Sequence, residues 1–255
     1  MSYIEREHTI DDIRYTIDED GGQMIINGNR SLIVACDCSA HRFEWVLKET
    51  CHMSAVGAYK IGFLLAMEIG LPRVTEMVRQ LTTKPLIYDH QKAGTDIPDT
   101  GKAFAHVCKK SGMDAIILFP QAGPETERAW IEAAKEEGLG VIVGGLMTHK
   151  GYTRSEGGYI ADEAVIEMYL NAVKAGVTDF VVPGTNPAAI EKIRLMLEHQ
   201  GIKPVLYSTG FGPQGGDVQK ATSAMGNNWH IIAGRAIYAA KNVRSAVEDM
   251  SALLK

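Results

Sequence analysis

Short apolar runs alternate with longer amphipathic segments from Leu32 to the end of the chain, and this alternation constrains the fold most. Each run has the length of a buried parallel strand, and each following segment has the periodicity of a surface helix. The expected strands are Leu32–Cys36, Ala58–Ile61, Pro85–Tyr88, Ala115–Phe119, Val141–Leu146, Phe180–Val182, Val205–Tyr207 and Ile231–Ala233. Eight such units predict an α/β fold, the (β/α)8 or TIM barrel. A doubly wound open sheet is the alternative, but even spacing of the units favours closure.

Helices are expected between these strands, for example at Lys102–Ser111, Ala129–Glu137, Ala161–Ala175, Ala188–Gln200 and Val243–Leu254. No low-complexity linker divides the chain, so residues 31–255 are interpreted as one catalytic barrel domain. Residues 1–30 are polar and are interpreted as an N-terminal extension that covers one end of the barrel. Two β-prone pieces in it, Arg14–Ile17 and Met24–Ile26, flank a turn signal and could pair as a β-hairpin.

Composition excludes several classes of function. The net charge of −5 and the pI near 5.9 do not indicate binding to nucleic acid or to a membrane surface. No apolar run approaches the roughly 20 residues that a bilayer requires. The first eight residues lack the apolar core of a secretion signal, and the four cysteines form no C-x-x-C pair. We therefore expect a cytoplasmic protein with reduced thiols.

Residues directly after the strands carry the chemistry of a barrel, because the carboxyl ends of the strands form the active-site rim. Asp89, Lys92 and Asp96 follow the third expected strand. Carboxylates this close keep a lysine charged, and the lysine keeps them ionised. Fixed charges of this kind stabilise a transition state without reorganising. Taken alone, the stretch could also be a solvated loop with ordinary surface charges.

Polar residues also occupy other rim positions, where turn residues alone would suffice. Asp37 follows the first expected strand, Lys60 lies in the second, and Thr148 follows the fifth. After the seventh and eighth strands come two glycine-rich loops, one with Gln214 and the other with Gly234 and Arg235. Barrels often bind phosphate between these two loops through backbone N–H groups. The pair of loops therefore predicts a phosphate site, to which Arg235 would add a bidentate contact.

The chain resembles the orotidine 5′-monophosphate decarboxylase family, within its superfamily with hexulose-phosphate synthase, over roughly Leu32 to Leu254. Matching segments are Leu32–Asp37, Tyr59–Gly62, Asp96–Thr100 (D-I-P-x-T), Met147–Gly151 with threonine where serine is usual, Pro213–Asp217 and Gly234–Tyr238. The P-Q-G-G and G-R-x-I-Y pair in the last two segments is quite specific.

The resemblance implies a catalytic set and a substrate-binding set of residues. The catalytic set is Lys92, Asp89, Asp96 and Lys60, in which Lys92 stabilises a carbanion at pyrimidine C6 and then protonates it. The substrate-binding set is Asp37, Ile97, Thr100, Thr148, Gln214, Gly234 and Arg235. In this family the D-I-P-x-T segment reaches the partner subunit's pocket, which implies a homodimer with shared sites. The implied reaction converts orotidine 5′-monophosphate to uridine 5′-monophosphate in pyrimidine biosynthesis, with neither cofactor nor metal.

The catalytic stretch departs from the family pattern in one respect. The family signature is D-x-K-x-x-D, whereas Asp89, Lys92 and Asp96 are spaced with two extra residues in total. A bulge at Gly94 could absorb them and leave the side chains in register. Alternatively, Lys92 or Asp96 is displaced, and a shift of about 1 Å can cost on the order of a hundredfold in rate.

Two other functions remain open at this stage. One is a metal-dependent sugar-phosphate aldolase or decarboxylase of the same superfamily, which uses an acidic residue after the second strand to help bind Mg²⁺. Lys60 matches that position, and its cation would repel the metal. The other is a non-catalytic nucleotide-binding relative whose stretched segment has lost the chemistry.

Overall fold

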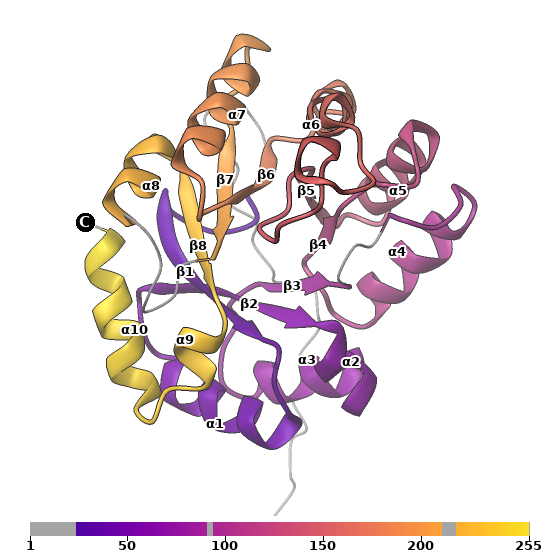
Figure 1. Cartoon of the computed structure of the whole chain (residues 1–255). Coiled ribbons are helices and arrows are strands. Elements are labelled where there is room, and N and C mark those ends of the chain that lie inside the picture. The colour runs from indigo at the N-terminus through magenta and orange to yellow at the C-terminus, as the bar shows by residue number, and fades with distance from the viewer. Residues whose placement is uncertain (1–23, 91–93, 211–217, 255) are drawn as a thin grey trace, which may run out of the picture.

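The computed structural model describes residues 24–90, 94–210 and 218–254, and these form a closed barrel of eight parallel strands. The strands pair in chain order (Figure 1) and are β1 Arg30–Cys36, β2 Val56–Gly62, β3 Leu86–Asp89, β4 Ala115–Leu118, β5 Gly140–Gly144, β6 Asp179–Pro183, β7 Val205–Thr209 and β8 Trp229–Ala233. The predicted (β/α)8 fold is thereby confirmed. Within the described ranges, no helix is long and apolar enough to cross a bilayer.

Helices surround the barrel (Figure 1): α1 Ala40–Thr50, α2 Phe63–Ile69, α3 Leu71–Arg79, α4 Thr100–Lys110, α5 Pro124–Glu136, α6 Asp162–Lys174, α7 Pro187–His199, α8 Val218–Ala224, α9 Arg235–Tyr238 and α10 Val243–Ser251. Two short 3-10 helices, η2 and η3, span Arg154–Glu156 and Ala252–Leu254. The largest difference from the expected bounds is at α5, which begins five residues earlier than its apolar pattern. Pro124 suits this start, because proline needs no hydrogen-bond acceptor in the first helical turn.

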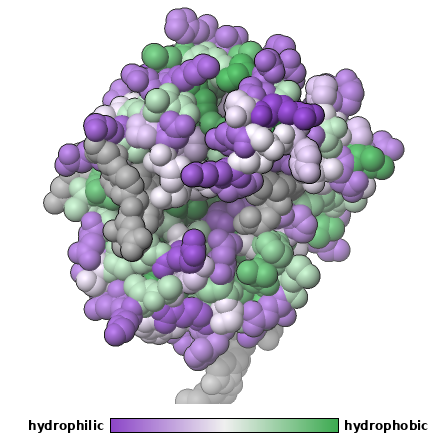
Figure 2. Space-filling model, in the orientation of Figure 1, coloured by the Kyte–Doolittle hydropathy of each residue, from purple (hydrophilic) through white to green (hydrophobic). Residues whose placement is uncertain are grey.

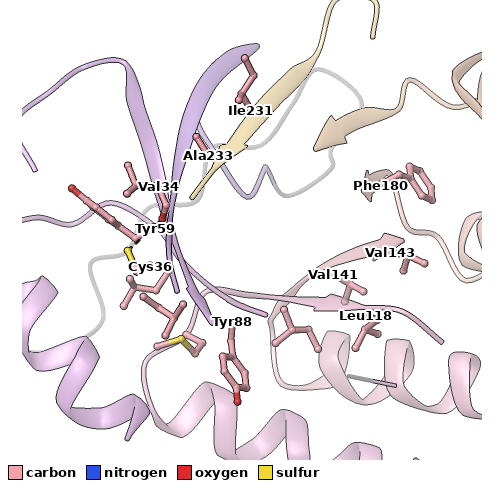
Figure 3. Close-up of a cluster of buried hydrophobic side chains, with 14 of the residues drawn as sticks. Val34, Cys36, Tyr59, Tyr88, Leu118, Val141, Val143, Phe180, Ile231 and Ala233 are labelled. Atoms are coloured by element: carbon pink, nitrogen blue, oxygen red, sulfur yellow. Dashed lines mark hydrogen bonds between the residues drawn. The ribbon is translucent and has the colours of Figure 1, made fainter. Parts of the chain in front are cut away.

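Side chains alternate along each strand and form two cores. Those facing outward pack between the strands and the helices, and Figure 3 shows part of this outer cluster, including Val34, Tyr59 and Tyr88. Those facing inward fill the barrel: Ile33, Ala35, Ala58, Ile87, Ala115, Ile117, Phe119, Ile142, Val181, Tyr207 and Ile232. The interior is thus a packed core, and the inward positions at the carboxyl ends of the strands remain for the site.

Residues 24–29 close the amino end of the barrel. They form bends and no strand, so the predicted strand at Met24–Ile26 is wrong; its expected partner, Arg14–Ile17, lies outside the described residues. Ile26 is only 2 % exposed and belongs to the inward-facing cluster. A Cβ atom on Gly140 would lie 2.6 Å from Ile25 Cγ1, so that glycine makes room for the segment. Burial of the two isoleucines inside the barrel explains their apolar character better than strand pairing does.

Polar side chains are buried toward the same end of the barrel. The Tyr207 hydroxyl donates to Asp179 Oδ1 over 2.7 Å, and Ser31 Oγ lies 2.8 Å from His230 Nδ1. Burial lowers the pKa of His230 to about 4, so this imidazole stays neutral at physiological pH. These groups satisfy one another and leave the opposite rim as the place for the chemistry.

Candidate active site

Three charged side chains from the first three strands meet at the carboxyl rim. Asp37 directly follows β1, Lys60 lies in β2, and Asp89 ends β3. The Lys60 Nζ atom lies 3.2 Å from each carboxylate oxygen of Asp37 and 2.9 Å from Asp89 Oδ2. Parallel pairing of β1, β2 and β3 brings these side chains together although they are far apart in sequence. The structure therefore contains a carboxylate–ammonium–carboxylate row.

Lys60 is the buried centre of this row. The residue is 4 % exposed, whereas the Asp37 and Asp89 side chains are 31 % and 15 % exposed. Burial acts to lower the pKa of Lys60, but the carboxylates of Asp89 and Asp37 outweigh it and raise the pKa above its ordinary value. Lys60 is consequently charged at neutral pH and compensates both carboxylates.

Gly62, at the end of β2, provides the space for this arrangement. A Cβ atom at position 62 would lie 1.7 Å from Asp37 Oδ1, so any other residue would displace the carboxylate. Gly62 was not among the site residues expected from the sequence. Its only sequence signal is its place in the Tyr59–Gly62 segment that follows the pattern of the resembled family.

The stretched segment after β3 is described only in part. Lys92 lies outside the described residues, and so does Gln214 of the expected phosphate loop. Gly94 is buried with φ +92°, and a Cβ atom there would be 3.6 Å from Pro120 Cα just beyond β4. Glycine tolerates this backbone conformation, which other residues rarely adopt. Gly94 thus lets the longer segment pass close to the end of β4.

Three further expected site residues follow Gly94 along the chain: Asp96 and Ile97, which are exposed, and Thr100, which is partly buried. Asp96 is exposed, and its Oδ1 accepts a hydrogen bond of 2.8 Å from the backbone N–H of Ile97. Ile97 is 59 % exposed, and Thr100, the first residue of α4, donates its hydroxyl to Ile97 O over 2.8 Å. The described hydrogen bond of the Asp96 side chain thus lies within its own segment, whereas the Asp89 side chain contacts Lys60.

The other expected binding residues lie on the loops after β5 and β8. Thr148 is exposed, and its Cγ2 is 3.8 Å from the place a Cβ atom would take on Gly210, where Thr185 also approaches. Gly234 precedes α9, and Arg235 is the exposed first residue of that helix. Figure 2 shows this face with a hollow near its centre and hydrophilic side chains around it. Charged and hydroxyl groups therefore surround the mouth of the barrel.

Arg42 belongs to this rim and was not expected from the sequence, and it contacts Tyr238, the last residue of the matching Gly234–Tyr238 segment. Arg42, on α1, donates from Nη2 to Ala240 O over 2.6 Å and from Nε to Tyr238 O. It thereby fixes the end of α9, the helix that begins with Arg235. Burial and the Asp37 carboxylate raise the pKa of the Tyr238 hydroxyl. These contacts join residues about 200 positions apart, so no local sequence pattern predicts them.

The fold and the charged row define the class of the protein: a single-barrel enzyme whose site lies at the carboxyl rim. Comparison with protein families matches residues 30–250 to the family described as "Orotidine 5'-phosphate decarboxylase / HUMPS family". The chain belongs to this family.

Relatives of known name support the same assignment. The orotidine 5'-phosphate decarboxylase of Methanocaldococcus jannaschii is 30 % identical over 199 residues, which is 78 % of this chain and 87 % of that protein. That of Methanococcus maripaludis strain S2 is 29 % identical over 203 residues, 80 % of this chain and 87 % of the relative. Among solved structures, orotidine 5'-phosphate decarboxylase from Pyrococcus horikoshii OT3 superposes with a TM-score of 0.71 at 26 % identity, covering 88 % of this chain and 99 % of that one.

A second solved structure supports the fold. Orotidine 5'-monophosphate decarboxylase from Methanocaldococcus jannaschii, complexed with inhibitor BMP, has a TM-score of 0.76 at 24 % identity and covers 89 % of this chain and all of that chain. The same barrel with the same chain order therefore occurs in both proteins.

Proposed function

We propose that this protein is a carboxy-lyase that converts orotidine 5′-monophosphate to uridine 5′-monophosphate in pyrimidine nucleotide biosynthesis. The observation that carries the proposal is the Asp37–Lys60–Asp89 row at the barrel rim, with Nζ–oxygen distances of 2.9–3.2 Å. Membership of the decarboxylase family and the names of the relatives support the reaction.

The proposed mechanism uses Lys92 as the group nearest the reacting carbon. The bond between C6 and the carboxylate breaks, carbon dioxide leaves, and the electron pair stays on C6. The Lys92 ammonium stabilises this carbanion electrostatically and then gives it a proton. Asp89 holds Lys92 from one side, and Asp96 of the second subunit holds it from the other. Lys60 holds Asp89 in place over a 2.9 Å contact.

The remaining rim residues are assigned to substrate binding. Asp37 would accept hydrogen bonds from the ribose hydroxyls, and Thr148 would contact the pyrimidine. Gln214, Gly234 and Arg235 would hold the phosphate. Since the phosphate lies far from C6, its binding energy serves to orient the reacting end, and its loss should reduce turnover as well as affinity.

Arg235→Ala and Gln214→Ala should each weaken the binding of phosphate-bearing ligands. The expected loss is about 1.5–3 kcal/mol, the range for hydrogen bonds to a charged group. Calorimetric titration with uridine monophosphate measures it, and uridine, which lacks the phosphate, provides the comparison. Both variants should bind uridine as the parent does. Unchanged affinity of either variant for uridine monophosphate would remove that residue from the phosphate site.

We also propose a homodimer with shared sites. Leu64, Met67, Ile97 and Val107 are 54–77 % exposed and lie on α2, on the Asp96–Thr100 segment and on α4, which follow the neighbouring strands β2 and β3. Figure 2 shows hydrophobic side chains gathered over α2. Exposed apolar groups that cluster beside a site favour an interface there. A second copy that covered this face would bring Asp96 and Ile97 toward its partner's site.

Mixing inactive Lys92→Ala protein with inactive Asp96→Ala protein should restore activity. Random exchange of subunits places one site with both residues intact in about half of the dimers. Specific activity should therefore rise to about a quarter of the parent value, and sedimentation should show a dimer. A fully active monomer would contradict the shared-site arrangement.

The metal-dependent alternative is disfavoured by Lys60. Its ammonium lies within hydrogen-bond distance of both carboxylates that could otherwise bind a cation. Loss of orotidine monophosphate absorbance, followed with and without a chelator, tests the proposed function. Equal rates in both assays are expected. Activity lost with the chelator would favour the metal-dependent reaction, and nucleotide binding without turnover would identify a non-catalytic relative.

A further inference from the structure

Two buried side chains of α5 hold the backbone of the Asp96–Thr100 segment. The Thr126 hydroxyl donates to Asp96 O over 2.9 Å, and the Trp130 indole donates from Nε1 to Ile97 O over 3.1 Å. Thr126 is 4 % exposed and Trp130 is 5 % exposed. They lie four residues apart, one helical turn, so they present both donors on the same side of α5. The contacts therefore fix two successive carbonyl groups.

Neighbouring residues of α4 pack closely around the Trp130 indole, which donates to Ile97 O. A Cβ atom on Gly101 would lie 2.8 Å from Trp130 Cδ1, so glycine at the start of α4 admits the indole. The Phe104 ring packs against the indole with its centroid 4.9 Å away. The Ile97 carbonyl also accepts the hydroxyl of Thr100 over 2.8 Å. The backbone is thus held from inside while the Ile97 side chain stays 59 % exposed.

We propose that Thr126 and Trp130 are positioning residues that hold Asp96 and Ile97 in place for the active site of the second subunit. The inference rests on the shared-site arrangement proposed above. Neither residue contacts the substrate; both act through the backbone of the segment. A displacement of about 1 Å in a group that orients the reacting lysine is enough for a rate loss on the order of a hundredfold.

Thr126→Val is the sharpest single change, because valine keeps the shape of threonine and removes the donor. Turnover should fall roughly ten- to a hundredfold. Thr126→Ser, which restores the hydroxyl, should recover most of it. Ile131→Val is the matched control: it trims a buried side chain of the same helix that makes neither contact. Ile131→Val should lower the urea midpoint about as much as Thr126→Val does, and its turnover should stay within about twofold of the parent value.

Mixed dimers separate positioning in the second subunit from a general loss of structure. Mixing Thr126→Val with Lys92→Ala protein leaves one site with an intact Lys92 and a properly held Asp96, so activity should rise toward a quarter of the parent value. Mixing Thr126→Val with Asp96→Ala protein leaves no such site, and activity should not rise. Trp130→Phe, which keeps an aromatic ring without the N–H, should behave as Thr126→Val does.

The contrary outcomes are distinct. Parent-like turnover in both Thr126→Val and Trp130→Phe overturns the inference. A second contrary outcome is that mixing Thr126→Val with Lys92→Ala protein gives no gain in activity, although Lys92→Ala and Asp96→Ala proteins restore each other. Thr126 would then act on the site of its own subunit. If those two variants do not restore each other, the shared-site arrangement itself fails and the inference falls with it.

Discussion

Lys92→Ala should lose turnover by more than the roughly 10²–10⁴-fold typical of a general acid, while the fold and the proposed dimer persist. The expected loss is larger because, in the proposed mechanism, the lysine also stabilises the carbanion electrostatically. Affinity for uridine monophosphate should change far less, since the proposed ribose and phosphate contacts come from other residues. Steady-state kinetics and calorimetric titration of the same preparation measure the two effects separately.

The removal of Lys92 also removes a cation that Asp89 and Asp96 would share. One of these carboxylates of the variant can then take up a proton, which by itself changes the binding of an anionic ligand. Asp89→Asn, measured alongside, separates this effect, because it removes a negative charge and keeps Lys92. If Lys92→Ala turns over at nearly the parent rate, the two extra residues have displaced Lys92 from the reacting carbon. Lys60 then becomes the first alternative for the catalytic lysine.

Lys60→Met should have the largest effect on stability. Methionine keeps much of the side-chain length but leaves Asp37 and Asp89 facing each other without their cation. The expected loss is about 3 kcal/mol at pH 7, the lower end for breaking a buried ion pair because Asp37 is partly solvated. Turnover should also fall at least about a hundredfold, since Asp89 loses its anchor. Urea unfolding and the decarboxylation assay measure the two effects.

The pH dependence of this loss has a defined direction. The pKa of Lys60 is raised above its ordinary value of 10.5, so its stabilising contribution is complete below pH 10.5 and is lost as the pH rises through the folded-state pKa. Lys48→Met is the control: Lys48 pairs with Glu44 on the surface of α1, and its loss should leave the urea midpoint nearly unchanged. A pH-independent loss equal to that of the control would refute the proposed charge compensation.

Hydrophobic alternation was enough to predict the barrel and its rim. Lys60 lies in a run that is otherwise apolar. A lysine in a buried strand is expected only where an oppositely charged side chain pairs with it at the strand end. The position of Asp37 after β1 and of Asp89 at the end of β3 then followed from parallel strand order. These predictions depend on hydrophobic periodicity, which is local in sequence, and on the regular strand order of a (β/α)8 barrel.

Other features depend on tertiary packing and could not be predicted. The apolar character of Ile25 and Ile26 suggested a strand, whereas the space inside the barrel decides their conformation. The role of Gly62 depends on the position of a carboxylate 25 residues earlier in the chain. Similarly, Thr126 and Trp130 look like ordinary residues of an amphipathic helix in the sequence. Their hydrogen bonds to the Asp96–Thr100 segment are visible only in the tertiary structure.

The segment at residues 24–29 also defines where the chain can be modified. It seals the end of the barrel remote from the catalytic rim, with Ile26 inserted among the inward-facing side chains. An affinity tag or a surface-tethering peptide joined directly to Met24 would therefore begin at the end of the barrel opposite its mouth and leave the mouth open to nucleotides. A tag that replaced the chain up to residue 29 would delete residues 24–29 and expose the apolar interior of the barrel to water. The boundary for immobilising the enzyme thus falls just before Met24.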